Sequence, residues 1–120
     1  MGKLKQMKIA VDFDGTLEFE NIQDQVLKLI EEGNHVEIVT TRYDEKNKHK
    51  YPFFSMLSKY EQDNYHSKLY SVAEKLNLKI NFTNFKYKAD FINENNFDML
   101  IDDNPDERRG LNKNVKFKLI

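Results

Sequence analysis

The chain of 120 residues contains no cysteine, which excludes disulfides, thiolate metal ligands and cysteine nucleophiles. It also lacks an excess of either charge, since a net charge of −1 creates no overall field that favours nucleic acid or membranes. No apolar run reaches the length of a membrane span, and Met1–Met7 is too short for a secretion signal. We therefore expect one domain over residues 1–120, cytoplasmic and without a membrane partner.

Strand-like apolar stretches alternate with stretches of helical periodicity. The predicted strands are Lys8–Val11, His35–Thr40, Lys79–Thr83, Met99–Ile101 and, at one edge, Val115–Leu119. The predicted helices are one capped by Asn21 and stopped near Gly33, a weaker one over Pro52–Tyr60, one from about Asp63 to Leu76, and Lys88–Asn95. Because strands separated by helices form parallel sheets covered on both faces, we predict an α/β fold. It is a three-layer, doubly wound, Rossmann-like sheet of five strands, mostly parallel.

Two carboxylates, Asp12 and Asp14, follow the first strand with one residue between them. Residues two apart in an extended chain point to the same side, so both side chains would face one crevice. Two acids held that close repel each other unless a cation lies between them, and oxygen ligands suit Mg²⁺. Gly15 would let the backbone turn tightly and approach a ligand. The sequence therefore predicts a divalent-metal site at the carboxyl edge of the sheet.

The segment Lys8–Leu17 resembles the first signature of the haloacid dehalogenase-like (HAD) superfamily, hhhhDxDGT. The resemblance implies that Asp12 is a nucleophile that becomes phosphorylated and that Asp14 is the general acid and base. Gly15 and Thr16 would then lie against the substrate. A surface turn rich in Asp and Gly is the alternative interpretation of the same residues.

The second predicted strand ends at Thr40, followed by Thr41 and Arg42. A hydroxyl at a strand end can bind a phosphoryl oxygen, and a guanidinium can pair with an anion through its planar fork. The second HAD motif is a Thr or Ser in this place, which matches Thr40. Thr41 is the adjacent alternative, and Arg42 is a candidate substrate contact. The β-propensity of threonine alone would also explain its presence here.

The fourth predicted strand ends at Asp102 and Asp103, and adjacent carboxylates are costly without a counter-charge. The pair resembles the fourth HAD motif, which implies that Asp103 is a direct or water-mediated magnesium ligand and that Asp102 supports it. Asp106 is either a further acid or, as we favour, part of a helical first turn that Asn104 caps and Pro105 begins.

The third HAD motif is a lysine shortly before the fourth, often at the start of a helix. Lys88 occupies that position, and Lys86 is the alternative. Lysines are usually solvated, so only position favours Lys88. With it, the resemblance extends from Lys8 to Asp103. It implies hydrolysis of a phosphate monoester with Mg²⁺ held by Asp12, Asp103 and the backbone carbonyl of Asp14.

The connections Leu17–Glu20 and Asn84–Tyr87 are too short for an inserted cap domain. We therefore expect a capless phosphatase for a phosphorylated small molecule or macromolecular end, with nucleic acid involved only as substrate. Tyr51–Leu57 is interpreted as a small lid, as an oligomer contact or, preferably, as a helix packed on the sheet. An oligomer is compatible with the sequence.

Two other classes of protein remain alternatives. Response-regulator receivers are doubly wound domains of similar size that use an aspartate, a hydroxyl and a lysine near magnesium. Their acidic pair is usually adjacent and their phospho-acceptor lies on a middle strand, unlike Asp12 and Asp14 here. A binding protein of HAD type that has lost turnover is the other alternative, and no motif residue is missing to support it.

Overall fold

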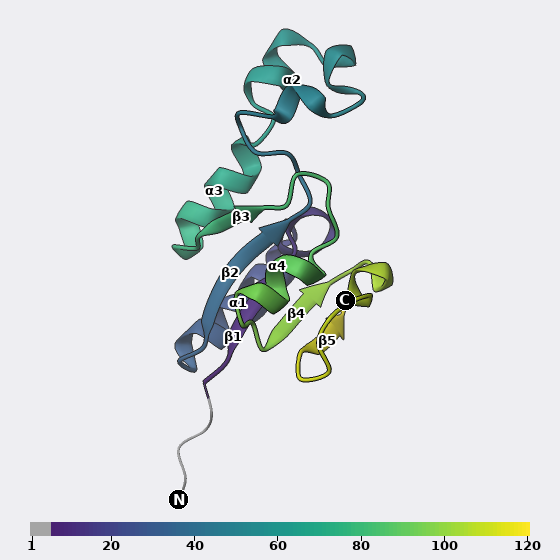
Figure 1. The fold of residues 1–120 in the computed structure, drawn as a ribbon. Helices are drawn as coiled ribbons and strands as arrows, with labels where there is room; N and C mark the ends of the chain where they lie inside the picture. Colours follow the sequence, from purple (N-terminus) through teal and green to yellow (C-terminus); the bar gives the residue numbers. More distant parts are fainter. Residues whose placement is uncertain (1–5) are drawn as a thin grey trace, which may run out of the picture.

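The computed structural model describes residues 6–120, and its centre is a five-stranded sheet in which every neighbouring pair of strands is parallel (Figure 1). The strands are β1 (Lys8–Val11), β2 (His35–Thr40), β3 (Ile80–Phe82), β4 (Met99–Asp102) and β5 (Lys116–Leu119). Their order across the sheet is β3-β2-β1-β4-β5. The predicted doubly wound α/β fold is confirmed, and the sheet is parallel throughout because the edge strand β5 also pairs parallel with β4.

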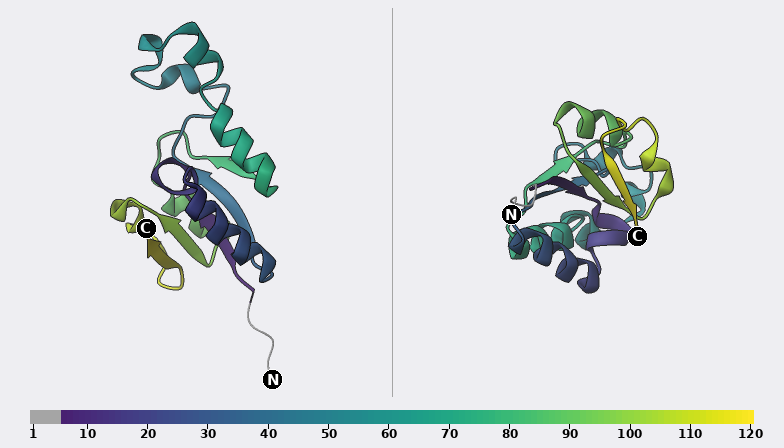
Figure 2. Two further views of the ribbon diagram at one scale, coloured as in Figure 1. Left: turned by 180° about the vertical axis from the view of Figure 1, so that it is seen from behind. Right: turned by 90° about the horizontal axis from the view of Figure 1, so that it is seen from below.

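Helices cover both faces of the sheet and give the molecule three layers (Figure 2). The helices are α1 (Glu20–Glu31), α2 (Lys59–Asp63), α3 (Ser67–Leu76) and α4 (Ala89–Glu94). Side chains alternate between the faces along β1, so Ile9 and Val11 enter the core beneath α1 and α3. Ala10, between them, enters the core beneath α4 together with Ile92 and Phe97. Burial on both faces explains why β1 is apolar along nearly its whole length.

Two helices, α1 and α3, begin at other residues than the sequence predicts. The helix α1 begins one residue before Asn21, with Phe19 as its N-cap, because the Phe19 carbonyl accepts the N–H groups of Ile22 and Gln23. Gly33 follows the helix with a φ of +96°, as expected for a left-handed cap. The helix α3 begins later than Asp63 because that residue ends the separate helix α2.

Residues 44–66, which we call the helical extension, lie beyond the carboxyl end of the sheet between β2 and α3 (Figure 1). The extension contains two single-turn 3₁₀ helices, Lys48–Lys50 and Phe54–Met56, followed by α2. These short elements stand in place of the single helix that was predicted over Pro52–Tyr60. The preferred interpretation of Tyr51–Leu57 as a helix packed on the sheet is therefore wrong. The segment packs within the extension because Tyr65 provides a contact for both Tyr51 and Phe54, at ring-centroid distances of 5.7 and 5.6 Å.

The strand order reverses direction at β1, which pairs with β2 on one side and with β4 on the other. In open α/β sheets a crevice forms at such a point outside the carboxyl ends of the strands, and ligands bind there. In the described part of the chain the loops after β1 and β3 contain no cap domain. Of the helices over residues 6–120, none combines the length and the apolar character needed to span a membrane.

Candidate active site

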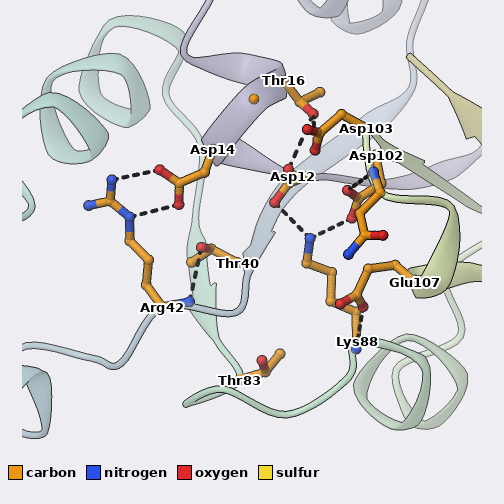
Figure 3. Close-up of polar contacts among 12 residues, drawn as sticks. Asp12, Asp14, Thr16, Thr40, Arg42, Thr83, Lys88, Asp102, Asp103 and Glu107 are labelled. Carbon is orange, nitrogen blue, oxygen red and sulfur yellow. Dashed lines mark hydrogen bonds and ion pairs between the residues drawn. The ribbon is translucent and has the colours of Figure 1, made fainter. Parts of the chain in front are cut away.

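Asp12 lies at the carboxyl end of β1, directly in the crevice (Figure 3). Its backbone N–H donates to the carbonyl of Ile101 over 2.9 Å, so the residue is still held beside β4. The chain then turns through the tight loop Phe13–Leu17, which the N–H of Leu17 closes on the Asp12 carbonyl at 3.1 Å. The Asp12 side chain is consequently fixed in the crevice with 5% of the residue exposed.

Lys88 contacts two of the predicted acids at once. Its Nζ donates to Asp12 Oδ1 over 2.7 Å and to Asp102 Oδ2 over 2.5 Å, and the residue is only 2% exposed (Figure 3). Its backbone N–H donates to Glu107 Oε2 at 2.9 Å, which fixes the point where α4 begins. Lys86, the alternative from the sequence, is exposed. Lys88 is therefore the lysine that the fold brings to the crevice.

Burial determines the electrostatics of this cluster. It raises the pKa of the Asp12 carboxyl to about 8, an effect that Lys88 opposes and Asp102 increases. Burial on its own lowers the pKa of Lys88, but the attraction of Asp12 and Asp102 outweighs it, so that the pKa lies above its usual value. The lysine thus stays charged, and its single charge does not offset the effect of burial on the pKa of Asp12.

Asp103 completes the acidic group from the more exposed side of the crevice. Oxygen atoms of Asp12, Asp102 and Asp103 all lie within 4.8 Å of one another. The hydroxyl of Thr16 donates to Asp12 Oδ2 at 3.2 Å and lies 3.3 Å from Asp103 Oδ1, so it bridges the two strand ends. Gly15 has a φ of +76°, and a Cβ there would lie 2.2 Å from Asp103 Oδ2. Any other residue would be strained by this φ, and its Cβ would displace the Asp103 carboxylate.

This donor set fits a hard divalent cation such as Mg²⁺. It offers carboxylate oxygens, which Mg²⁺ prefers, and it contains no nitrogen or sulfur ligand. When all three acids are ionised, they and the one ammonium of Lys88 leave two negative charges uncompensated. A divalent cation matches that excess.

Asp14 does not face the same crevice as Asp12, contrary to the sequence prediction. Phe13, between the two acids, already belongs to the helical turn Phe13–Leu17, which ends the extended conformation on which the two-residue alternation depends. The Asp14 carboxylate instead accepts two hydrogen bonds from the Arg42 guanidinium, at 2.9 Å from Nε and 2.7 Å from Nη2 (Figure 3). The Asp14 side chain therefore cannot join the acidic group in this arrangement, although it lies immediately beside it in the chain.

Arg42, which the sequence offered as a substrate contact, is held by several groups of the protein. Its Nη1 donates to the Tyr65 carbonyl at 3.0 Å and to His66 Nδ1 at 3.1 Å. His66 in turn donates from Nε2 to the carbonyl of Tyr43 at 2.9 Å and is almost fully buried. These contacts fix the guanidinium, so that it positions Asp14 as a rigid, two-pronged partner.

Thr40 ends β2 beside the Asp12 loop and is fully buried. Its Oγ1 accepts the backbone N–H of Arg42 at 3.2 Å, which leaves its own proton for another acceptor. Thr41 is partly exposed and lines a pocket next to Asp14. The two threonines thus serve different regions of the site, although they are neighbours in the chain.

Beyond Asp103 the chain forms a 3₁₀ helix, Pro105–Arg108, that Asn104 caps by accepting the N–H of Asp106 at 3.0 Å. Asp106 is exposed, which agrees with the favoured interpretation of this residue as part of a helical turn. This turn also places Glu107 beside Lys88, a contact that no local sequence pattern predicts. The contact of His66 with Arg42 likewise has no local sequence signal.

The fold brings together six of the predicted site residues. Five are joined by hydrogen bonds, namely Asp12, Thr16, Lys88, Asp102 and Asp103, and Gly15 lies against Asp103. It assigns Asp14, Thr41 and Arg42 to the adjacent pocket. No model of a protein family, no curated protein and no solved structure matches this chain.

Proposed function

We propose that the protein is a magnesium-dependent phosphate monoester hydrolase of the HAD type. The observation that carries this proposal is the buried contact of Lys88 with Asp12 and Asp102, beside Asp103, at the point where the strand order reverses. It supports the order of motifs seen in the sequence, because residues up to 91 positions apart meet at one sheet edge. A merely solvated set of surface charges would not be buried in this way.

Mg²⁺ would be held by Asp12, Asp103 and the backbone carbonyl of Asp14, with Asp102 in support. When bound, it would supply charge neutralisation for the phosphoryl group and the carboxylates. Lys88 supplies a permanent positive charge at the same place, and the Thr40 hydroxyl supplies a donor. These two groups would hold phosphoryl oxygens as negative charge moves toward the leaving group.

The reaction that we propose has two steps. In the first, Asp14 has taken up a proton from water in exchange for one of its two hydrogen bonds to Arg42; a carboxylate oxygen of Asp12 then attacks phosphorus, the ester P–O bond breaks, and Asp14 gives that proton to the departing alkoxide. In the second, Asp14 takes a proton from water, which attacks the aspartyl-phosphate and releases inorganic phosphate and the free Asp12 carboxylate. Arg42 holds Asp14 at the adjacent pocket, and in this proposal the leaving group departs on that side.

Strand order disfavours a receiver-type phosphorylation switch. Receivers have the flavodoxin-like order 2-1-3-4-5, whereas this sheet has the order 3-2-1-4-5. In addition, the acid that would be phosphorylated lies at the first strand. A binding protein without turnover would have no need for the two-pronged positioning of Asp14 by Arg42.

Phosphate release from p-nitrophenyl phosphate in the presence of Mg²⁺ tests the proposal. We expect continuous turnover by the wild type and none by Asp12→Asn, with an unchanged circular dichroism spectrum. Asp106→Asn is the matched control, because Asp106 is an exposed acid four residues after Asp102. Activity retained in Asp12→Asn would exclude this nucleophile. One stoichiometric phosphorylation without release would favour the switch, and no reaction in the wild type would favour the binding protein.

A further inference from the structure

A pocket of about 350 Å³ opens beside Asp14 at the carboxyl edge of the sheet. Its walls are Asp14, Thr41, Arg42, Tyr43, Tyr51, Tyr65 and Phe85. Tyr43 and Phe85 come from the loops after β2 and β3, whereas Tyr51 and Tyr65 come from the helical extension. The pocket is therefore bounded by aromatic rings from two separate parts of the fold, and its polar end is the Asp14–Arg42 pair.

Phe85 is held in a conformation that a bulky residue rarely adopts. Its φ is +71° and that of the preceding Asn84 is +54°. The conformation is imposed by two hydrogen bonds to the loop after β2, from Phe85 N to the Thr41 carbonyl at 2.7 Å and from Asn84 N to the Arg42 carbonyl at 3.2 Å. Strained residues of this kind concentrate at ligand-binding sites.

The result of that strain is an exposed aromatic surface. The Phe85 ring stacks on Tyr43 with a centroid distance of 5.4 Å and an interplanar angle of 20°, yet 60% of Phe85 remains exposed. A nearly parallel pair of rings with a free face is suited to a further planar group. The arrangement does not serve the core, because Phe85 belongs to neither buried cluster among the described residues.

The pocket combines polar and aromatic groups. The Arg42 guanidinium contacts Asp14, and Thr41 provides a further polar group in the lining. The same guanidinium lies 5.3 Å from the centroid of Tyr65, so aromatic surface adjoins the polar pair. A ligand bound beside Asp14 would therefore have both hydrogen-bonding groups and aromatic faces within the pocket.

We propose that this pocket receives the nucleoside of a nucleoside monophosphate, with the ribose beside Thr41 and Arg42 and the base on the aromatic rings. The inference rests on the proposed function, in which Asp14 protonates the leaving oxygen. The leaving alcohol must then extend into the space that Asp14 borders. Stacking on aromatic side chains is a common way for proteins to bind nucleobases.

An aryl phosphate such as phosphotyrosine fits this combination of groups less well. Its ring is bonded directly to the leaving oxygen, so the ring would lie at the polar end of the pocket against Asp14 and Arg42. In a nucleotide the ribose separates the ester oxygen from the base. That spacing lets the sugar occupy the polar part of the pocket while the planar base reaches the aromatic rings.

The test compares adenosine 5′-monophosphate with ribose 5-phosphate, which share the sugar and the primary leaving oxygen and differ only in the base. We expect kcat/KM for the nucleotide to be about 5- to 150-fold higher, the range that stacking of one base supplies. Phe85→Leu keeps apolar bulk but removes the ring, so it should bring this ratio towards one. Tyr60→Leu is the matched control, because Tyr60 is 76% exposed in α2 and does not line the pocket, and its ratio should equal that of the wild type.

Two measurements, a kinetic comparison of substrates and a binding titration, distinguish failure of the nucleoside assignment from failure of the proposed function. Equal kcat/KM for both sugar phosphates, or a higher value for O-phosphotyrosine than for the nucleotide, would overturn the nucleoside assignment while leaving a phosphatase. If no ester is hydrolysed, calorimetric titration of Asp12→Asn with adenosine 5′-monophosphate and with ribose 5-phosphate tests whether the pocket binds the nucleoside. Tighter binding of the nucleotide that Phe85→Leu abolishes would support the pocket without the activity, and equal binding of both ligands would overturn the inference.

Discussion

Replacing Lys88 with methionine keeps the length of the buried side chain and removes its charge. In the wild type the ammonium lies 2.7 Å from Asp12 and 2.5 Å from Asp102, and both acids are almost completely buried. Removing one partner of a buried ion pair costs about 3–5 kcal/mol, because the remaining charge has neither water nor a counter-ion. At about 4 °C per kcal/mol for a domain of this size, Tm should fall by about 12–20 °C.

Urea denaturation at pH 9, above the pKa of about 8 of the Asp12 carboxyl, and in the presence of a chelator measures this loss, because divalent cations could otherwise replace the lysine charge. Lys86→Met, which removes an exposed charge two residues away, should change the free energy of unfolding by less than about 0.5 kcal/mol. Adding Asp12→Asn to Lys88→Met removes one of the unpaired acids and should restore about 0.5–3 kcal/mol. A free energy of unfolding for Lys88→Met within about 1 kcal/mol of the wild type would refute the described charge balance.

Three further outcomes follow from the site and its surroundings. Gly15→Ala should lower kcat/KM for p-nitrophenyl phosphate at least about tenfold, because a Cβ 2.2 Å from Asp103 Oδ2 displaces that acid. Gly33→Ala, with a positive φ of +96° between α1 and β2 and only the Gln6 side chain near its new Cβ, should affect stability alone. In thermal melts Mg²⁺ at 100 times its dissociation constant should stabilise the wild type by about 2.7 kcal/mol and Asp103→Asn by clearly less, and equal shifts would argue against Asp103 as a ligand. Burial and the nearby Arg42 lower the pKa of His66 below its usual 6.5, so the unfolded chain binds the proton first. The free energy of unfolding should therefore be complete above pH 6.5 and decrease below it, and His66→Gln should flatten that part of the profile; an unchanged slope would contradict this role.

The residues that the sequence could place are those that directly adjoin a strand or helix. Asp12, Asp102 and Asp103 end apolar strands, and Lys88 begins a helix, so a parallel sheet brings them to one edge without any knowledge of side-chain packing. Asp14 could not be placed in this way. Its direction depends on the helical turn that begins at Phe13 and on Arg42, and neither effect follows from strand alternation.

The helical extension was beyond sequence analysis for a different reason. Its turns are too short for a hydrophobic period, and rings from Tyr51, Phe54 and Tyr65 stabilise them by packing on one another. Phe85 likewise has no local signal. Its exposure and its backbone conformation result from hydrogen bonds to a loop more than 40 residues earlier in the chain.

The position of β1 at the centre of the sheet has a consequence for the order of folding. This strand is synthesised first, yet its partner on one side is β4, where Ile9 pairs with Met99, 90 residues later. Contacts of such long range form slowly, because a large loop must close before they contribute. A nascent chain that ends before residue 88 would carry Asp12 without its lysine, so the cluster of Asp12, Lys88 and Asp102 can assemble only after the chain has been extended through β4.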